Sequence, residues 1–236
     1  MSLADRVAAD YAGRLRSFGE RRPGRFAVEV AGLTVVSLGV DEPWGVQVVA
    51  MPDPPDHAAV VAAVAWCRER AHRPQVIVRE RDRDALASYD VSEMLATLAA
   101  PAVGEQTLLL VEHAIDVGEF RHVYGAAFGM SAALVEALVV EDDLAALPHL
   151  LGRVGGRAVA CAQVRAGERL AYVSGVGVRP EEQGRGYGTA MLAACRAEAA
   201  RLGCERVWLN AAPRTAPFYE GIGFELVDTY VALAGT

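Results

Sequence analysis

The spacing of apolar residues changes repeatedly between strand-like and helix-like periods, and this pattern predicts an α/β protein. In the C-terminal part, strands are predicted at residues 107–112, 149–154, 157–164, 170–178 and 206–210. Helices are predicted at residues 117–128, 131–140 and 189–201. Gly155-Gly156 lies between two of these strands and predicts a hairpin turn.

The N-terminal part shows a similar mixture of elements. Its predicted elements are a helix at 1–18, a strand pair at 25–38 around Ala31-Gly32, a strand at 44–51, a helix capped by Asp56, a strand at 75–78 and a helix at 84–99. Pro101 to Gln106 is the expected linker. We therefore predict two domains, residues 1–102 and residues 103–236.

A glycine-rich segment joins the strand at 170–178 to the helix at 189–201. Gly184, Gly186 and Gly188 alternate with other residues just before the helix. Glycines allow the backbone to approach a ligand closely, and the first N–H groups of a helix have no partner within the helix. Several N–H groups that converge in this way bind an anion, most naturally phosphate, and Arg185 adds a positive charge.

Spacing excludes two common phosphate loops, because the chain has no G-x-x-x-x-G-K-[ST] and these glycines do not fit G-x-G-x-x-G. What the segment does contain is Gln183-x-x-Gly186-x-Gly188 after Val178-Arg179-Pro180. This pattern resembles the acetyl-CoA pyrophosphate loop of the GNAT superfamily of N-acetyltransferases, [QR]-x-x-G-x-[GA] after V-x-P. The resemblance implies a mixed, mostly antiparallel sheet flanked by helices, with acetyl-CoA as cosubstrate. The residues that it assigns to cofactor binding are Val176, Val178, Gln183, Gly184, Arg185, Gly186, Gly188, Thr189 and Asn210.

A second block downstream resembles the closing segment of the same family, A-x-x-[FL]-Y-x-x-x-G-F. It begins at Ala216, reaches Tyr219 and ends at Phe224. The resemblance implies that Tyr219 protonates the leaving thiolate, that Asn210 contacts the pantetheine arm, and that a backbone N–H near Val176 polarises the carbonyl. The alternatives are that Tyr219 is a core tyrosine and that Asn210 ends a strand for local hydrogen-bonding reasons.

The base that would deprotonate an amine is not evident from the sequence. Ser174 stands where many family members have a glutamate, and a serine cannot take a proton at neutral pH without help. Glu112, Glu119 and His122 are other candidates, acting through water. We therefore leave the base open and treat Ser174 as a residue that positions water.

These features favour an N-acetyltransferase that moves the acetyl group of acetyl-CoA to a primary amine of a small molecule, by direct attack in a ternary complex. Two alternatives stay open. One is a non-catalytic CoA-binding sensor or assembly module, and the other is an acetyltransferase acting on a protein N-terminus or lysine. The acceptor itself is not readable from the sequence.

Charge, hydropathy and cysteine spacing each argue against particular functions or sites. The net charge of −7 argues against non-specific binding of nucleic acid. The uncharged stretch at 122–135 is too short to span a membrane. The four cysteines show no C-x-x-C and no zinc spacing, so we expect reduced thiols, no metal and a cytoplasmic protein. A monomer or homodimer is expected.

The two parts of the chain show a similar order of elements. The helix at 56–70, the strand at 76–78 and Tyr89 parallel the helix at 189–201, the strand at 207–209 and Tyr219. We therefore consider a degenerate GNAT-like repeat in the N-terminal part, with chance similarity as the alternative. The first copy is not expected to bind CoA, because its turn at 51–57 contains three prolines and no glycine.

Overall fold

A computed structural model describes residues 1–20, 24–51, 53–103, 109–140 and 147–234. The chain forms two compact units. The first unit comprises Met1–Leu98, Asn210–Glu220 and Leu226–Thr236, and the second comprises Ala99–Leu209 and Gly221–Glu225. Two C-terminal segments thus belong to the unit that holds the N-terminal part. The division predicted from sequence, between residues 102 and 103, stays a prediction about separate domains.

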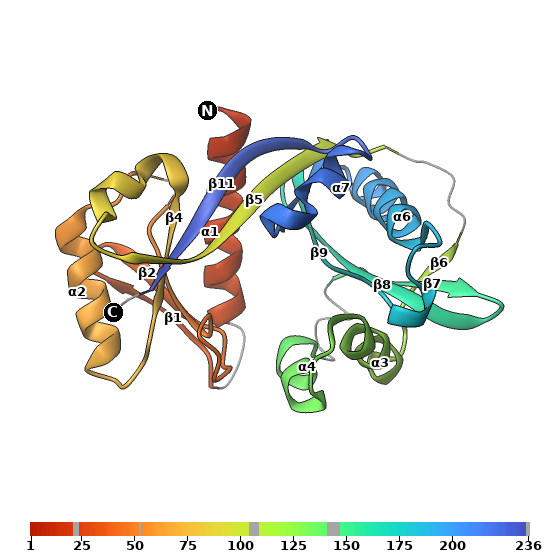
Figure 1. Cartoon of the computed structure of the whole chain (residues 1–236), viewed down its shortest axis with the longest axis horizontal. Helices are drawn as coiled ribbons and strands as arrows, with labels where there is room; N and C mark the ends of the chain where they lie inside the picture. The colour runs from red at the N-terminus through yellow and green to blue at the C-terminus, as the bar shows by residue number, and fades with distance from the viewer. Residues whose placement is uncertain (21–23, 52, 104–108, 141–146, 235–236) are drawn as a thin grey trace. The chain divides into compact units, whose positions relative to one another are not determined.

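The first unit contains six strands with helices packed on them (Figure 1). Its elements are α1 (Leu3–Glu20), β1 (Phe26–Val30), β2 (Leu33–Ser37), β3 (Val46–Val49), α2 (His57–Arg68), β4 (Gln75–Arg79), the 3-10 helix η1 (Glu80–Leu86), β5 (Asp90–Pro101), the 3-10 helix η3 (Pro213–Thr215), α7 (Ala216–Glu220) and β11 (Glu225–Ala234). The strand order is β1-β2-β3-β4-β11-β5. β3 and β4 are parallel, whereas β11 pairs with β4 in the antiparallel sense.

Local sequence explains several of these boundaries. Ala31 and Gly32 both have positive φ, at 51° and 82°, which is the backbone of the tight turn that joins β1 to β2. Asp56 accepts a hydrogen bond from the amide of Ala58 and so caps α2. Val35 belongs to the core beneath α2, while its neighbour Val36 lies close to Gly19 of α1. The two helices therefore cover opposite faces of this sheet.

The second unit holds the predicted phosphate loop. Its elements are β6 (Leu110–His113), α3 (Val117–Phe128), α4 (Ala132–Leu138), β7 (His149–Val154), β8 (Arg157–Ala166), β9 (Leu170–Val178), the 3-10 helix η2 (Pro180–Glu182), α6 (Tyr187–Arg201) and β10 (Arg206–Ala211). The strand order is β10-β9-β8-β7-β6, in which β9 and β10 are parallel and the other pairs are antiparallel. The strand orders of the two units confirm the fold predicted from the sequence, a mixed, mostly antiparallel sheet flanked by helices.

Helices α3 and α6 cover opposite faces of β7, β8 and β9 (Figure 1). A Cβ atom built on Gly177 of β9 would lie 2.7 Å from Cβ of Ala127 in α3. A Cβ atom built on Gly152 of β7 would lie 2.7 Å from the sulfur of Met191 in α6. Small residues in the strands thus let both helices lie close to the sheet.

One predicted element is wrong and another was not predicted. The helix predicted at 84–99 is absent, because residues 84–86 end a 3-10 helix and Asp90–Pro101 forms the long strand β5. The run from Ala96 to Ala100 is buried throughout, and a continuous apolar run fits a buried helix and a buried strand equally well. The sequence analysis also missed β11. Glu141-Asp142-Asp143 and half of the predicted linker, residues 104–106, lie outside the described residues.

The order of elements in the two parts of the chain is similar. In each part a strand, a helix and a second strand parallel to the first are followed by a 3-10 helix and then by a long strand. The corresponding segments are β3-α2-β4-η1-β5 and β9-α6-β10-η3-β11, the latter with α7 inserted. Descent of both parts from one repeat stays a hypothesis.

Candidate functional site

The glycine-rich loop has the backbone that a phosphate site needs. Gly184 and Gly186 have φ of 76° and 81°, a region that residues with a side chain rarely adopt. Gly186 is the N-cap of α6 and has no side chain that could cap the first amides of that helix. Gly188 instead lies within the first turn of α6. The loop is exposed, and a Cβ on Gly184 would meet open space. Its backbone N–H groups are therefore accessible to an anion.

The acidic side chains around the loop are paired with arginines, which weakens their repulsion of an anion. Glu182 contacts Arg185 at 2.9 Å and Arg157 at 3.3 Å. Glu181 also pairs with Arg157, and its own backbone N–H together with Arg157 holds its pKa below the usual range. Gln183 donates a hydrogen bond to the carbonyl of Val178, 3.2 Å away, which fixes the start of the loop against the end of β9. The two acidic residues are thus held by three arginines, Arg157, Arg179 and Arg185.

Strand β9 contains a bulge immediately before the loop. Gln163 pairs with Ser174 and Cys161 with Gly177, so Gly175 and Val176 both lie opposite the single residue Ala162. Gly175 has φ of 59°, which fits a bulge with a glycine in the left-handed region. A bulge leaves backbone groups outside the regular ladder. The amide of Val176, proposed from the sequence to polarise the acyl carbonyl, lies in this irregular segment.

β9 and β10 separate at the end of the sheet where the bulge lies. In the described part of the chain they pair only from Leu170 with Arg206 to Tyr172 with Trp208. The rings of Tyr172 and Trp208 pack with centroids 4.4 Å apart at the last of these pairs. Beyond this point the half-buried residues Val176 and Val178 of β9 have no neighbour in β10. Within the described residues, the diverging strands therefore leave this part of β9 without a strand partner on its β10 side.

Asn210 and Tyr219 belong to the first unit. Asn210 is near the end of β10, and its side-chain carbonyl accepts a hydrogen bond from the hydroxyl of the fully buried Thr97, 2.8 Å away. Tyr219 lies in α7 and packs its ring against Phe218. Burial raises the pKa of the Tyr219 phenol, so the group keeps its proton at neutral pH. This protonation state suits a general acid, although the role itself stays a prediction.

Two of the proposed bases are held in ion pairs. Arg153 contacts Glu119 through two nitrogens, at 2.7 and 2.8 Å, and its Nε lies 2.6 Å from Glu112. Hydrogen bonding from Arg153 holds the pKa of Glu119 below its ordinary value. A carboxylate that is stabilised as the anion is a weak proton acceptor. The structure therefore disfavours Glu119 as the base.

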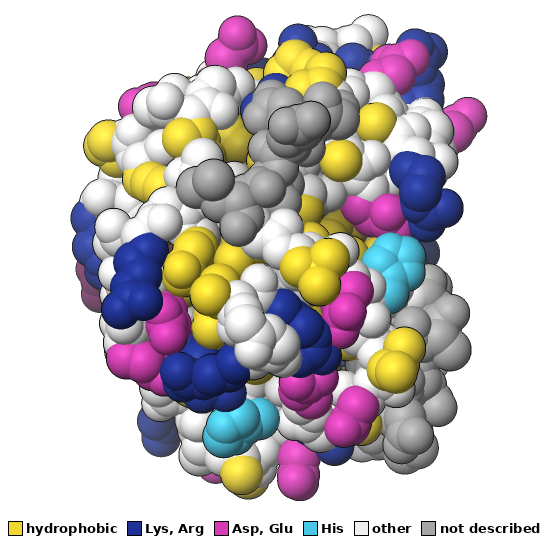
Figure 2. Space-filling view, turned by 90° about the vertical axis from the view of Figure 1, so that its right-hand side faces the viewer, with side chains coloured by type: hydrophobic (Ala, Val, Ile, Leu, Met, Phe, Trp, Pro, Cys, Tyr) yellow, Lys and Arg dark blue, Asp and Glu magenta, His cyan; other side chains and the backbone are white. Residues whose placement is uncertain are grey.

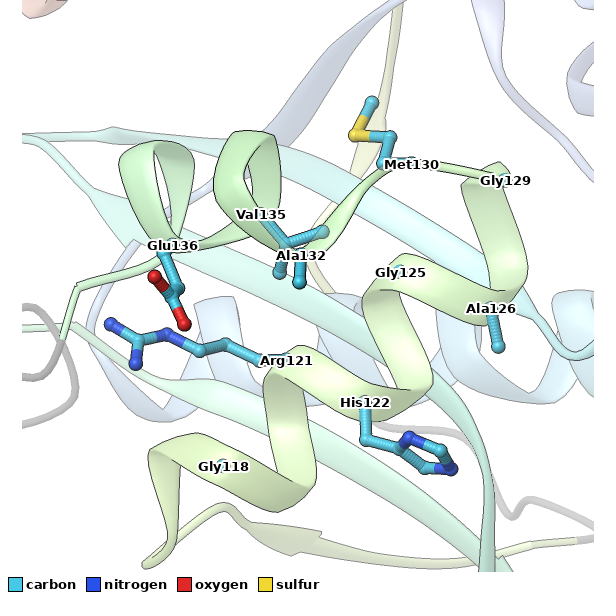
Figure 3. Close-up of a pocket in the computed structure, with 10 residues that line it drawn as sticks. All are labelled: Gly118, Arg121, His122, Gly125, Ala126, Gly129, Met130, Ala132, Val135 and Glu136. Carbon is cyan, nitrogen blue, oxygen red and sulfur yellow. The ribbon is translucent and has the colours of Figure 1, made fainter.

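The third proposed base, His122, lines a hollow of about 560 Å³ between α3 and α4. Figure 3 shows that His122 and Glu136 point in different directions from the two helices. On α3, Phe120 and Val123 are in the core, whereas His122 and Gly125 line the hollow. At 100° per residue, the hollow-facing positions lie on the opposite side of α3 from those that pack on the sheet. His122 therefore faces away from the β9 bulge.

Sequence reasoning missed two polar residues of the second unit, His149 and Gln163. His149 is 1% exposed and packs edge-on against Phe120. Its Nε2 lies 2.8 Å from the side-chain nitrogen of Gln163, and Gln163 in turn accepts a hydrogen bond from Ser174. The available signal was a polar residue beside a run of small and apolar residues in each of two strands.

Three further observations concern the surface, metal ions and membranes. Figure 2 shows acidic and basic side chains interspersed with apolar ones on the face that it draws. Within the described ranges, no group of three or more His, Cys, Asp or Glu side chains is arranged to hold a metal ion. No described helix is both long enough and apolar enough to cross a membrane.

Comparisons with known proteins agree with this geometry. The model of the Acetyltransferase (GNAT) family matches residues 119–224, which include the bulge, the loop and the Tyr219 block. A comparison with curated proteins finds no match.

Three solved structures resemble the chain in fold. A GCN5-related N-acetyltransferase from Kribbella flavida is 20% identical, with a TM-score of 0.74 over 99% of this chain and 96% of that one. A putative acetyltransferase of the GNAT family from Novosphingobium aromaticivorans is 17% identical, with a TM-score of 0.58 over 98% and 96%. A GCN5-related glucosamine N-acetyltransferase region of a fungal multi-domain protein is 14% identical, with a TM-score of 0.63 over 89% and 31%.

The first two likenesses extend over nearly the whole chain, so the N-terminal part is also a shared part of the fold. The family match indicates an acyltransferase. Residues 119–224 of this chain are a domain of the GNAT acetyltransferase family.

Proposed function

We propose that this protein transfers the acetyl group of acetyl-CoA to a primary amine of a small molecule, by direct attack in a complex that holds both substrates. The observation that carries the proposal is the arrangement at the end of β9. Within one compact unit, a bulged strand with an open edge runs directly into a glycine loop at an uncapped helix N-terminus.

Acetyl-CoA supplies an activated acyl group as a thioester, and the chain's residues hold and polarise it. The backbone N–H groups of the loop and of the first turn of α6 would bind the pyrophosphate, with Arg185 nearby. The amide of Val176 would donate to the acyl oxygen as negative charge develops there. Asn210 would contact the pantetheine arm.

The proton and bond balance of the transfer is simple. The neutral amine nitrogen forms a bond to the acyl carbon while the carbon–sulfur bond breaks, giving an amide and a thiol. One proton leaves the nitrogen and one reaches the sulfur, and Tyr219 is the proposed donor to the sulfur. The raised pKa of Tyr219 keeps this proton in place until the thiolate forms.

Small acceptors are also favoured by a fold neighbour. The fungal region of similar fold is named a glucosamine N-acetyltransferase, and glucosamine is a small primary amine. That likeness concerns the fold alone, so the acceptor class of this protein needs a direct test with a panel of amines.

The loop is tested by calorimetric titration of acetyl-CoA into the wild type and into Gly186→Glu. The new carboxylate should occupy the anion site and repel the pyrophosphate, so we expect binding to be lost. Gly203→Glu is the matched control, because Gly203 has the same left-handed φ as Gly186, 81°, but follows the C-terminal end of α6. A Cβ on Gly203 would meet nothing within 4 Å. The control should bind acetyl-CoA as the wild type does.

The reaction is tested by thiol release from acetyl-CoA with a panel of small primary amines, a lysine peptide and a peptide with a free N-terminus. Release with the small amines supports the proposal. Release with the peptides alone would replace the small molecule by a protein acceptor. Tight binding of acetyl-CoA without thiol release for any of these acceptors would favour a non-catalytic CoA-binding module. The motivation for that alternative is Ser174, which stands where many family members have a glutamate.

A further inference from the structure

A row of three polar side chains crosses the second unit beneath α3. His149 of β7 pairs with Gln163 of β8, and Gln163 pairs with Ser174 of β9, so the three residues lie side by side on one face of the sheet. The same face carries the apolar residues Leu151 and Cys161, which pack against α3. Burial decreases along the row, from His149 at 1% exposure to the half-buried Ser174 beside the bulge.

The hydrogen bonds in this row have a defined direction. Nδ1 of His149 lies 3.0 Å from the carbonyl oxygen of Leu147, which can only accept, so Nδ1 carries the proton. The side-chain nitrogen of Gln163 lies 2.8 Å from Nε2 and can only donate, so Nε2 accepts and the arrangement corresponds to a neutral ring. This orients the Gln163 carbonyl towards Ser174, whose hydroxyl donates to it at 3.2 Å.

The direction of the row determines what Ser174 presents to a ligand. Its proton is directed inward to Gln163, so only the lone pairs of its oxygen remain for a partner on the other side. Ser174 directly precedes the bulge at Gly175 and Val176, where the proposed function places the acyl carbonyl. A group with an N–H bond is the complementary partner at this position.

We propose that Ser174 accepts a hydrogen bond from the acceptor amine and that His149 and Gln163 are positioning residues that keep its oxygen in the accepting state. This inference rests on the proposed function and specifies how the acceptor is held. A primary amine suits the arrangement because it has two N–H bonds. One is held by Ser174 while the other proton is lost after attack.

The row holds the amine but does not deprotonate it. A serine hydroxyl is far too weak a base at neutral pH. The carboxamide of Gln163 separates it from His149, and an amide passes a proton only through its unstable imidic acid form. The amine must therefore reach the site neutral, and its excess proton must pass to water.

The test compares thiol release with ethylamine as the probe in the wild type, Ser174→Ala, Ser174→Thr and Gln163→Leu. Loss of one such hydrogen bond should raise KM for ethylamine about 3- to 10-fold in Ser174→Ala, with kcat and the Kd for acetyl-CoA nearly unchanged. Ser174→Thr keeps the hydroxyl and should retain the wild-type KM. Gln163→Leu frees the hydroxyl proton to turn outward and should raise KM as Ser174→Ala does.

Ser92→Ala is the matched control, because Ser92 is likewise hydrogen-bonded to a glutamine side chain, that of Gln75, although as the acceptor, and it lies in β5 of the first unit. It should leave KM for ethylamine unchanged. An unchanged KM in Ser174→Ala, or an equal change in Ser92→Ala, would overturn the inference while leaving the proposed function intact. A wild type that binds acetyl-CoA but acetylates no amine would overturn the proposed function, and with it the role of Ser174.

The state of His149 is checked independently of activity by long-range ¹H–¹⁵N NMR of the imidazole. The row requires a neutral ring protonated at Nδ1 at neutral pH. A ring that carries its proton on Nε2, or on both nitrogens, would overturn the proposed direction of the row even in a fully active enzyme.

Discussion

Replacement of Gly177 by alanine tests the close packing of α3 on β9, on which the geometry of the bulge depends. The added Cβ would lie 2.7 Å from Cβ of Ala127 and 2.9 Å from a ring carbon of Phe128. Carbon atoms in contact are ordinarily about 3.5–4.0 Å apart, so strand and helix must separate by roughly 1 Å. Gly177 has no left-handed φ, and the effect is therefore steric rather than conformational.

The expected magnitude combines two opposing effects. Insertion of an extra carbon atom into a well-packed core costs about 1–3 kcal/mol. The loss of glycine's freedom in the unfolded chain returns roughly 0.4–1 kcal/mol. We expect Gly177→Ala to lower the free energy of unfolding of the second unit by about 1–2 kcal/mol.

Urea unfolding followed by the fluorescence of Trp208 measures this change. Trp208 is fully buried in the second unit, and Trp44→Phe with Trp66→Phe would make it the sole tryptophan. The same background is used for every variant, so that only the substitutions under test differ.

A double-mutant cycle identifies the cause of the destabilisation. Ala127→Gly removes the closest atom that the new Cβ meets, and the pair Gly177→Ala with Ala127→Gly should therefore lose less stability than the sum of the single variants. Gly13→Ala is the control, because a Cβ there meets nothing within 4 Å, and it should not lower the stability that Trp208 reports. Full stability in Gly177→Ala, or strict additivity with Ala127→Gly, would refute the packing argument.

Two further predictions concern the buried charges and the thiols. Arg79 is 1% exposed and contacts Asp228 at 2.6 Å and Asp5 at 2.8 Å, so Arg79→Met should cost about 3 kcal/mol at pH 7 in urea unfolding. Arg79 holds the pKa of Asp5 well below its usual range, so the part of the stabilisation that comes from the Arg79–Asp5 pair is present above about pH 4 and is lost as the pH falls. A difference between the two proteins that does not shrink towards pH 3 would contradict the assignment. All four cysteines are buried, and burial raises the pKa of Cys67 to about 11 and that of Cys161 to about 12. A thiol reagent at pH 8 should therefore label none of them in the native protein and all four in denaturant, and rapid native labelling of any one would show that its site opens.

The sequence by itself determined the elements whose signals are local. The Asp56 cap, the Ala31-Gly32 turn and the bounds of α3 all follow from a few neighbouring residues, and the structure has each of them where it was predicted. The conformation of the loop at 183–188 was also predictable, because it depends on consecutive backbone positions that glycine marks. The family followed from the same short segments.

Tertiary structure decided what depends on partners far apart in the chain. Residues 90–101 became a strand, and not a helix, because an apolar run takes its form from the sheet that it joins. Arg153 forms ion pairs with Glu112 and Glu119, which disfavours Glu119 as the base, and His122 lies on the outer side of α3. Composition alone could not show either arrangement. The row from His149 to Ser174 depends on the register of three strands and on a one-residue bulge. Register is set by the packing of whole strands, so residues 25 positions apart came together without a local signal.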